Sequence, residues 1–392
     1  MAKTIKNTIS TAPEKEKAML VAVDSGPKKG AWPVNESLDE LEQLALTAGA
    51  TIVGRLSQQT QNPSKNYYLG KGKLEELKEL KEDLGYNLLI FDDELSALQQ
   101  RNLEDELGVK IIDRVALIID IFARHARSRE GMLQVSLAQS EYLLPRLAGQ
   151  WSHLERLGGG IGTRGPGETQ IETDRRLAQK KISRLKQQIE DIKKQRKLHQ
   201  KSRQQSEIPT LALVGYTNTG KSTLLNALSH ASILAEDKLF ATLDPTTRRV
   251  HLPDNMFALI SDTVGFIRKL PPGLVSAFRA TLEELNQADI LLHVVDFSNP
   301  RAAEQCDTVE NILEDMEISI KPRITVLNKI DRALDPSKTW TEKDAIEFIE
   351  ETIGDTRPNT VIVSAARGWG MEKLKETISS AVTDLRRPTD NS

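Results

Sequence analysis

Residues Gly215 to Ser222, GYTNTGKS, place two glycines, a lysine and a hydroxyl at fixed spacing. In a G-x-x-x-x-G-K-S loop between a strand and a helix, backbone N–H groups surround phosphate oxygens, the lysine contacts the β and γ phosphates, and the hydroxyl is a ligand for Mg²⁺. The apolar run LALV precedes the loop and a helical pattern follows it. We therefore predict a nucleotide phosphate site made of Gly215, Tyr216, Thr217, Asn218, Thr219, Gly220, Lys221, Ser222 and Thr223.

A second phosphate-binding element follows the apolar run FALI. In the sequence DTVG, the Asp262 carboxylate can hold Mg²⁺ through water, and the Gly265 N–H can contact a γ-phosphate. A D-x-x-G pattern alone is a weak signal, but its position after a strand makes it strong. The predicted site therefore also includes Asp262, Thr263, Val264 and Gly265.

The base is predicted from NKID, which follows the apolar run ITVL. The Asp331 carboxylate can accept hydrogen bonds from guanine N1–H and the 2-amino group. Adenine has no amino group there and offers a lone pair at N1, so it incurs a penalty on the order of a few kcal/mol. A backbone N–H of the Ser364–Ala366 segment can bind guanine O6. We therefore predict GTP and GDP as ligands, bound through Asn328, Lys329, Ile330, Asp331, Ser364, Ala365 and Ala366.

A second protein ligand for Mg²⁺ is expected from a loop that is released when the γ-phosphate is lost. The segment FATLDPTTR offers three threonines between Ser222 and Asp262. We favour Thr242 because FATLDP resembles the corresponding loop of other GTPases; Thr246 and Thr247 stay open. The predicted metal ligands are thus Ser222, Thr242 and Asp262, and the loop adds Phe240, Ala241, Thr242, Leu243 and Asp244 to the GTP site.

Two residues bear on the rate of hydrolysis. Many GTPases follow D-x-x-G with a glutamine that orients the attacking water, and here the position holds Phe266. We expect slow intrinsic hydrolysis that a partner or a rearranged loop accelerates. Asn218 has two open interpretations: GTPases with asparagine at this place often bind K⁺ in the role of an arginine finger, or the side chain only stabilises the loop.

The elements around these motifs divide the chain into three regions. Residues 18–129 alternate short apolar runs with amphipathic helical patterns, which predicts a small α/β domain with a mainly parallel sheet. Residues 130–207 contain helical patterns around a glycine-rich loop at 158–167. Residues 208–386 alternate five apolar strands with helices, which predicts a doubly wound, mainly parallel P-loop domain. The expected tails are 1–17, disordered, and 387–392.

The middle region has the pattern of an antiparallel helical coiled coil. Ile171, Arg175, Ala178, Ile182, Leu185, Ile189 and Ile192 step alternately by four and three residues, interrupted at Arg175, and the preceding helix is the expected partner. Between Gln170 and Ser206, twelve Lys and Arg face four acids, a net charge of +8. This charge suits a phosphate backbone, although a solvated coiled-coil face is the alternative.

The glycine loop contains GIGTRG, which matches the G-x-G-x-x-G pattern of dinucleotide sites. A polar, helix-like segment precedes it and no second strand follows, so the context of a dinucleotide site is missing. Small residues instead allow the backbone to approach folded RNA closely. The predicted RNA contacts are Gly160, Gly162, Arg164, Gly165, Lys193, Lys194, Arg196 and Lys197.

The composition is that of an ordinary globular protein. Of 392 residues, 39% are hydrophobic and 28% charged, with a net charge of −3, so any nucleic-acid preference must be local. The single cysteine, Cys306, excludes a disulfide framework and fits a reducing compartment. No apolar run approaches the roughly 20 residues that cross a bilayer. We expect a cytoplasmic monomer without stable membrane insertion.

The order of the parts resembles the HflX family of ribosome-associated GTPases. The resemblance rests on GGGIGTRGPGETQIETDRR at Gly158–Arg176, on FATLDPTTR and on DTVGFI, and it covers about Ala18 to Leu385. It implies a protein that binds the large (50S) ribosomal subunit and its RNA, with the N-terminal domain directed to the peptidyl-transferase centre, and that splits ribosomes under stress. Some relatives continue into a further C-terminal domain, which we expect to be absent here.

Two other classes of function were weighed. One is a regulatory GTPase switch that acts on a protein effector or a membrane surface through the basic coiled coil. The other is an RNA-modifying enzyme, but the N-terminal region shows no nucleophile, metal cluster or methyl-donor motif in its sequence. An adenine-nucleotide site in the N-terminal domain stays open.

Overall fold

The fold is described from a computed structural model. It describes residues 16–24, 26, 32–147, 166–204, 208–229, 239–240, 242–269, 284–354 and 358–386, without the side chains of 166–171 and 196–204. The chain forms two compact units, with the division between Leu117 and Ile118. The predicted domain boundaries at 129/130 and 207/208 stay predictions.

The first unit is a small α/β domain. Its four-stranded sheet has the order β2-β1-β3-β4, and all neighbouring strands are parallel. The elements are β1 (Lys17–Asp24), α1 (Val34–Thr47), β2 (Thr51–Gln59), α2 (Lys71–Leu84), β3 (Leu88–Phe91), α3 (Ala97–Leu107) and β4 (Lys110–Asp113).

Local signals define the ends of its helices. The Ser96 side chain accepts from the Gln99 N–H and the Gln99 side chain accepts from the Ser96 N–H, so a capping box begins α3. Gly108 ends the same helix in the left-handed conformation. Leucines of α2 and α3 pack with alternate residues of β1, β3 and β4 into one buried cluster that includes Met19, Val21, Leu77, Leu89, Phe91, Leu103 and Ile111.

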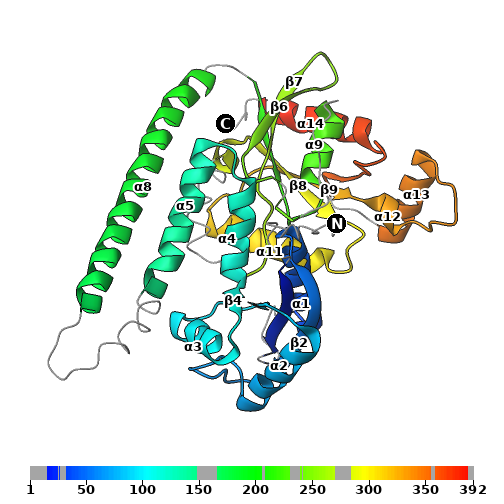
Figure 1. Cartoon of the computed structure of the whole chain (residues 1–392). Helices are drawn as coiled ribbons and strands as arrows, with labels where there is room; N and C mark the ends of the chain where they lie inside the picture. The colour runs from blue at the N-terminus through cyan, green and yellow to red at the C-terminus, as the bar shows by residue number, and fades with distance from the viewer. Residues whose placement is uncertain are drawn as a thin grey trace, which may run out of the picture. The chain divides into compact units, whose positions relative to one another are not determined.

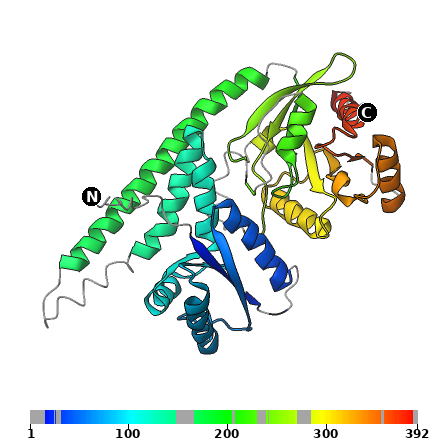
Figure 2. The same cartoon turned by 45° about the vertical axis from the view of Figure 1, so that its right-hand side comes forward.

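The chain continues through α4 (Arg114–His125) into a pair of long helices in the second unit. These are α5 (Arg129–Leu143), which runs into the 3-10 turn η1 (Leu144–Arg146), and α8 (Pro166–Gln204). The two helices lie side by side and antiparallel (Figures 1 and 2). Ile182, Leu185 and Ile189 of the predicted seam are buried against Leu137 of α5, whereas Arg175 is exposed.

The rest of the second unit is a six-stranded sheet of order β10-β9-β8-β5-β7-β6 with helices around it. Its elements are β5 (Thr210–Val214), α9 (Lys221–Ser229), β6 (Thr246–His251), β7 (Phe257–Asp262), β8 (Ile290–Asp296), α11 (Ala302–Asp315), β9 (Arg323–Asn328), α12 (Ile330–Ala333), α13 (Glu342–Ile353), β10 (Thr360–Ile362) and α14 (Met371–Arg386). The five predicted strands are β5, β7, β8, β9 and β10.

The strand β6 was not predicted. It is antiparallel to β7 at the edge of the sheet, and its sequence TTRRVH has mostly polar side chains. An edge strand needs few buried residues, and here only Val250 is buried, so the hydrophobic pattern gives little signal. The sheet is therefore mainly parallel, as predicted, with one antiparallel edge.

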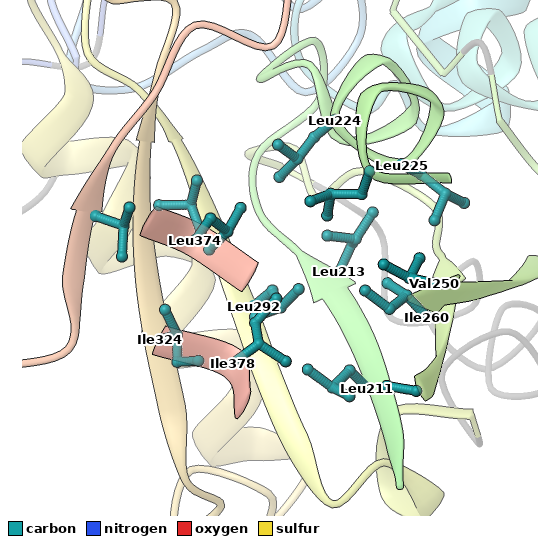
Figure 3. Close-up of a cluster of buried hydrophobic side chains, with 14 of the residues drawn as sticks. Leu211, Leu213, Leu224, Leu225, Val250, Ile260, Leu292, Ile324, Leu374 and Ile378 are labelled. Carbon is teal, nitrogen blue, oxygen red and sulfur yellow. The ribbon is translucent and has the colours of Figure 1, made fainter. Parts of the chain in front are cut away.

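One large core holds the sheet and places the phosphate loop. Leu224 and Leu225 of α9 and Leu374 and Ile378 of α14 pack on side chains of the central strands (Figure 3). Because these side chains are fully or almost fully buried, α9 is held with its first turn at the carboxyl end of β5. Ligands of open α/β sheets bind at this end of the strands.

Candidate functional site

The loop from Gly215 to Gly220 joins β5 to α9, as the sequence predicts. Gly215 and Gly220 have positive φ, +151° and +89°. A Cβ atom at Gly215 would lie 2.3 Å from the Val294 carbonyl oxygen, and one at Gly220 would lie 2.4 Å from Asn328 Nδ2. The loop therefore needs glycine at both places, because it closes over the Val294 backbone at Gly215 and over the Asn328 side chain at Gly220.

Lys221 begins α9 with its ammonium group inside this loop. Nζ donates to the carbonyl oxygens of Tyr216 at 2.7 Å and Gly215 at 3.2 Å. Burial lowers the pKa of Lys221 to about 8, while the charge of Asp262 acts in the opposite direction. A buried cation held by neutral carbonyls lacks a full counter-charge, which a phosphate group can supply.

Three oxygen-bearing side chains meet beside the lysine. Ser222 Oγ donates to Asp262 Oδ2 at 2.6 Å, Thr242 Oγ1 donates to the same oxygen at 3.0 Å, and the two hydroxyls are 2.7 Å apart. Burial raises the pKa of Asp262, and the Ser222 hydroxyl opposes this shift. Asp262 Oδ1 is buried without a hydrogen-bond partner in the described structure. Hard oxygen donors around a buried carboxylate suit Mg²⁺.

The other two threonines belong to a strand. Thr246 and Thr247 are the first residues of β6 and pair with Asp262 and Ser261 of β7 through the backbone. The Thr247 hydroxyl is 2.8 Å from Ser261 Oγ. Of the three predicted candidates, the geometry therefore favours Thr242.

The predicted base-binding segments are connected to the phosphate loop. Asn328 Nδ2 donates to the Thr219 carbonyl at 2.8 Å, and Asn328 Oδ1 accepts from the Ala365 N–H at 3.0 Å. Ser364 Oγ donates to Asp331 Oδ1 at 2.6 Å and so orients the carboxylate. Since the Ala365 N–H is engaged by Asn328, Ala366 is the better placed donor for a base oxygen.

Lys329 forms a second connection across the site. Its Nζ donates to the Asn218 carbonyl at 2.6 Å and is 2.9 Å from Asp296 Oδ2 at the end of β8. Lys329 and Asn218 both have left-handed backbone conformations, with φ of 64° and 59°. Asp296 was not predicted, because its contact with Lys329 depends on the packing of β8 beside β9.

Phe266 is buried and cannot orient a water molecule. It is 3% exposed, its N–H donates to the Gly215 carbonyl at 3.1 Å, and its carbonyl accepts from the Thr217 N–H at 2.7 Å. These two backbone hydrogen bonds attach Phe266 to the phosphate loop. Gly265, just before it, leaves space for the Thr217 backbone, because a Cβ there would lie 2.6 Å from Thr217 Cα.

One pocket collects most of the predicted GTP-binding residues. Its lining residues are Thr217, Asn218, Gly220, Lys221, Ser222, Thr223, Phe240, Thr242, Thr263, Gly265, Asn328, Lys329, Asp331, Arg332, Ala365 and Ala366. Arg332 was not predicted, although it directly follows the NKID motif. Predicted residues that support the pocket without lining it are Gly215, Tyr216, Thr219, Asp262, Val264, Ile330 and Ser364.

Two residues of the FATLDP segment point elsewhere. Leu243 is buried, and the Asp244 carboxylate binds backbone N–H groups at the start of α5. Both were predicted as GTP-binding residues, but neither lines the pocket, because this part of the segment turns toward the helical region. Ala241 lies outside the described residues.

The predicted RNA contacts are only partly within the described structure. Lys193 is half-buried and Lys194 exposed on α8, while the side chains of Arg196 and Lys197 are not described. Gly160, Gly162, Arg164 and Gly165 lie outside the described residues. No helix in the described part of the chain is both long and apolar enough to cross a membrane.

A phosphate loop between β5 and α9, an adjacent D-x-x-G segment and an NKID loop at the same sheet edge define a P-loop GTPase. The family described as "50S ribosome-binding GTPase" matches residues 210–329. The families described as "GTP-binding GTPase N-terminal" and "GTP-binding GTPase Middle Region" match residues 35–123 and 125–203.

Comparison with individual proteins identifies a family within the P-loop GTPases. The chain is 49% identical to GTPase HflX of Caldanaerobacter subterraneus subsp. tengcongensis, covering 94% of this chain and 81% of the relative. It is 42% identical to GTPase HflX of Escherichia coli K12, covering 89% and 79%. The crystal structure of the SsGBP and GDP complex is similar with a TM-score of 0.50 and 25% identity, covering 94% and 99%. The chain belongs to the HflX family of GTPases, and it binds and hydrolyses GTP.

Proposed function

We propose that this GTPase acts in the cytoplasm on the large (50S) ribosomal subunit, binds its RNA, and splits or rescues ribosomes under stress. The observation that carries the proposal is the charge of α8. Its seam residues are buried against α5, while Lys180, Lys181 and Arg184 are exposed on the remaining surface. The segment from Gln170 to Ser206, with a net charge of +8 in a chain of net charge −3, is a local electrostatic footprint for a phosphate backbone. The family description "50S ribosome-binding GTPase" supports the same partner.

Within the nucleotide site, the proposed roles follow the geometry. The phosphate loop and Lys221 bind the β and γ phosphates, and Asp331 with Ala366 binds guanine. Ser222, Thr242 and Asp262 hold Mg²⁺, directly or through water. When bound there, Mg²⁺ would neutralise the negative charge that develops during phosphoryl transfer. Asn218 lines the same pocket, and a K⁺ ion bound at this residue is the proposed additional cofactor.

The buried Phe266 makes hydrolysis dependent on a partner. Since this side chain offers no hydrogen bond to water, orientation of the attacking water must come from backbone groups or from a repositioned loop. We therefore propose a slow intrinsic rate that the large subunit stimulates.

Sedimentation of the protein with large ribosomal subunits tests the partner. With a non-hydrolysable GTP analogue, the protein should sediment with the subunits, and less so with GDP. Replacing Lys193, Lys194, Arg196 and Lys197 with glutamine should weaken binding and flatten its salt dependence, by somewhat under one unit of log-log slope for each phosphate contact removed.

The control replaces three exposed lysines of the GTPase domain, Lys338, Lys343 and Lys373, with glutamine. These lie on other elements, so ribosome binding and its salt slope should be unchanged. Binding that survives ribonuclease and is unaltered by the α8 variant would instead favour a protein effector as the partner of this GTPase.

A further inference from the structure

The loop that carries Thr242 contacts α4 on one side of Thr242 and the start of α5 on the other. We call residues 240–245 the threonine loop; Ala241 in it is not described. Two residues before Thr242, the Phe240 ring packs edge-on against Phe122 of α4, with centroids 4.6 Å apart and planes at 69°. Both rings are buried, with exposed fractions of 2% and 1%. Such an aromatic pair adds a preferred geometry to the apolar contact.

Two residues after Thr242, Asp244 binds the first turn of α5. Its Oδ2 accepts from the N–H groups of Arg127 at 2.7 Å and Ser128 at 2.6 Å, and its Oδ1 accepts from the Ser128 hydroxyl. Ser128 Oγ in turn accepts from the Gly131 N–H at 2.9 Å and caps the helix. A carboxylate is favourable here because the free N–H groups at a helix N-terminus carry partial positive charge.

Gly131 shows how closely the two segments approach. A Cβ atom added to Gly131 would lie 2.5 Å from Asp244 Oδ1 and 3.2 Å from Ser128 Oγ. The residue lies within a helix, where alanine is normally the more stable choice. The glycine is thus explained by the space that Asp244 requires, and not by the backbone conformation.

Thr242 lies between these two anchors in the sequence. Phe240 N–H donates to Thr217 Oγ1 of the phosphate loop at 3.1 Å, which fixes the loop from the nucleotide side as well. Thr242 then reaches Ser222 and Asp262 at 2.7 and 3.0 Å. We infer that Phe122 of α4 and Ser128 at the start of α5 are positioning residues for the magnesium ligand Thr242.

These contacts couple the helical pair α5 and α8 to the position of Thr242. Anything that moves the first turn of α5 shifts the position of Thr242, and anything that fixes Thr242 fixes the first turn of α5, because coupling between two sites is reciprocal. Since α5 packs along α8, the basic helix and the metal site share one mechanical connection through Ser128 and Asp244. The inference rests on the proposed function in one respect, the assignment of Thr242 to Mg²⁺.

The test measures how GTP hydrolysis by the full chain depends on Mg²⁺ concentration. Ser128→Ala removes the hydroxyl that contacts Asp244, and Asp244→Ala removes the carboxylate. Each should raise the Mg²⁺ concentration for half-maximal rate by about five- to tenfold, the equivalent of losing one helix cap. The double variant should be no worse than the more severe single variant, because both remove the same contact.

Two further variants separate this effect from a general loss of stability. Ser96→Ala removes the corresponding cap of α3 in the other unit and should leave the Mg²⁺ dependence unchanged. Gly131→Ala favours the helix but displaces Asp244, so it should weaken Mg²⁺ binding without lowering the helical content. If Gly131 had only a structural role in the helix, the substitution by alanine would leave Mg²⁺ binding unchanged.

Thr242→Ala tests the proposed metal site separately from the positioning role of Phe122 and Ser128. If it leaves the Mg²⁺ dependence unchanged, the proposed metal site is wrong. If it weakens Mg²⁺ binding while Ser128→Ala, Asp244→Ala and Gly131→Ala all behave like the parent protein, the metal site stands and the inferred positioning role is overturned. Slower amide exchange in the first turn of α5 when Mg²⁺ and a GTP analogue bind would show the reciprocal effect.

Discussion

At the scale of single residues, nucleotide identity depends on Asp331 and on the hydroxyl that orients it. Ser364 occupies one lone pair of Oδ1, at 2.6 Å, which leaves the second oxygen and the remaining lone pair for the base. The segments that carry Asp331 and Ser364 are far apart in the sequence, and this hydrogen bond explains why both are needed to recognise guanine. It also indicates that the charge and the acceptor pattern of residue 331 can be changed without changing the phosphate loop.

We predict that Asp331→Asn exchanges the preferred base. An amide can donate to the 2-oxo group of xanthine, whereas it opposes the 2-amino group of guanine. Affinity for GTP should fall by about 100-fold, equivalent to roughly 2–3 kcal/mol for an unpaired buried group, and affinity for xanthosine triphosphate should rise. Competition between the two nucleotides for the same protein measures both changes. Unchanged relative affinities would contradict the role of Asp331.

A second residue, His293 of β8, makes stability depend on pH. The ring is 4% exposed, Nδ1 is 3.9 Å from Glu310 Oε1, and Arg323 also faces this carboxylate. Burial lowers the pKa of His293 from 6.5 to about 4, while Glu310 opposes the shift and the charges of Arg323 and Lys221 add to it. The folded protein therefore holds the neutral ring over a range in which the unfolded chain binds a proton.

The sign of the effect follows from linkage. Stability from the neutral ring is complete above the unfolded pKa and is lost as pH falls from about 6.5 toward 4. Between pH 7 and pH 5, this group should lower the free energy of unfolding by about 2 kcal/mol. Urea unfolding of His293→Gln should show a smaller loss over this interval by that amount. Equal losses in both proteins would mean that the ring is already protonated or solvated in the fold.

At the scale of elements, the helical pair depends on a narrow apolar seam. Ile182, Leu185 and Ile189 are each 8–9% exposed, whereas Leu177 on the same helix is 56% exposed. Leu185→Ala should destabilise the pairing of α5 and α8 by about 2 kcal/mol through a cavity and lost apolar contact. The matched control Leu177→Ala should change it by less than about 0.5 kcal/mol. Amide exchange in α5 measures the difference, and equal protection in both variants would argue against the seam.

Sequence alone predicts those parts of the site that are contiguous in the chain. The phosphate loop and the segments DTVG and NKID each hold their chemistry within a few residues, and a buried strand precedes each of them, so their position at one sheet edge follows from parallel topology. The same holds for the seam of α8, which has helical periodicity.

The parts that sequence does not predict depend on distant contacts. Asp244 is two residues from Thr242 in the sequence, yet its partners are Arg127 and Ser128, which lie more than a hundred residues earlier. No local pattern marks Ser128 as anything other than a helix cap. The edge strand β6 was missed for a different reason, because a polar strand with one buried residue has no clear alternation.

At the scale of the whole molecule, the basic helix and the catalytic site have to act on each other if the proposed function is correct. The chain itself provides one connection, because α8 is followed in the sequence by β5 of the GTPase domain. The contact of Asp244 with the start of α5 supplies a second connection that reaches the threonine loop directly. Binding of the helical region to RNA can therefore change the position of Thr242 without unfolding either part.

We predict that large ribosomal subunits accelerate GTP hydrolysis well above the intrinsic rate. The reason is that binding rearranges a loop so that it orients the attacking water, which the Phe266 side chain cannot do. Shortening Gly158–Gly165 should abolish subunit separation while the free protein keeps near-normal GTP affinity, since the described lining residues of the nucleotide pocket all lie between 217 and 366, in the GTPase domain. Stopped-flow light scattering of intact ribosomes, recorded together with phosphate release, measures both effects. The control is Ser96→Ala, which should separate subunits like the parent protein. Separation at the parental rate by the shortened protein would place the working end of the molecule elsewhere.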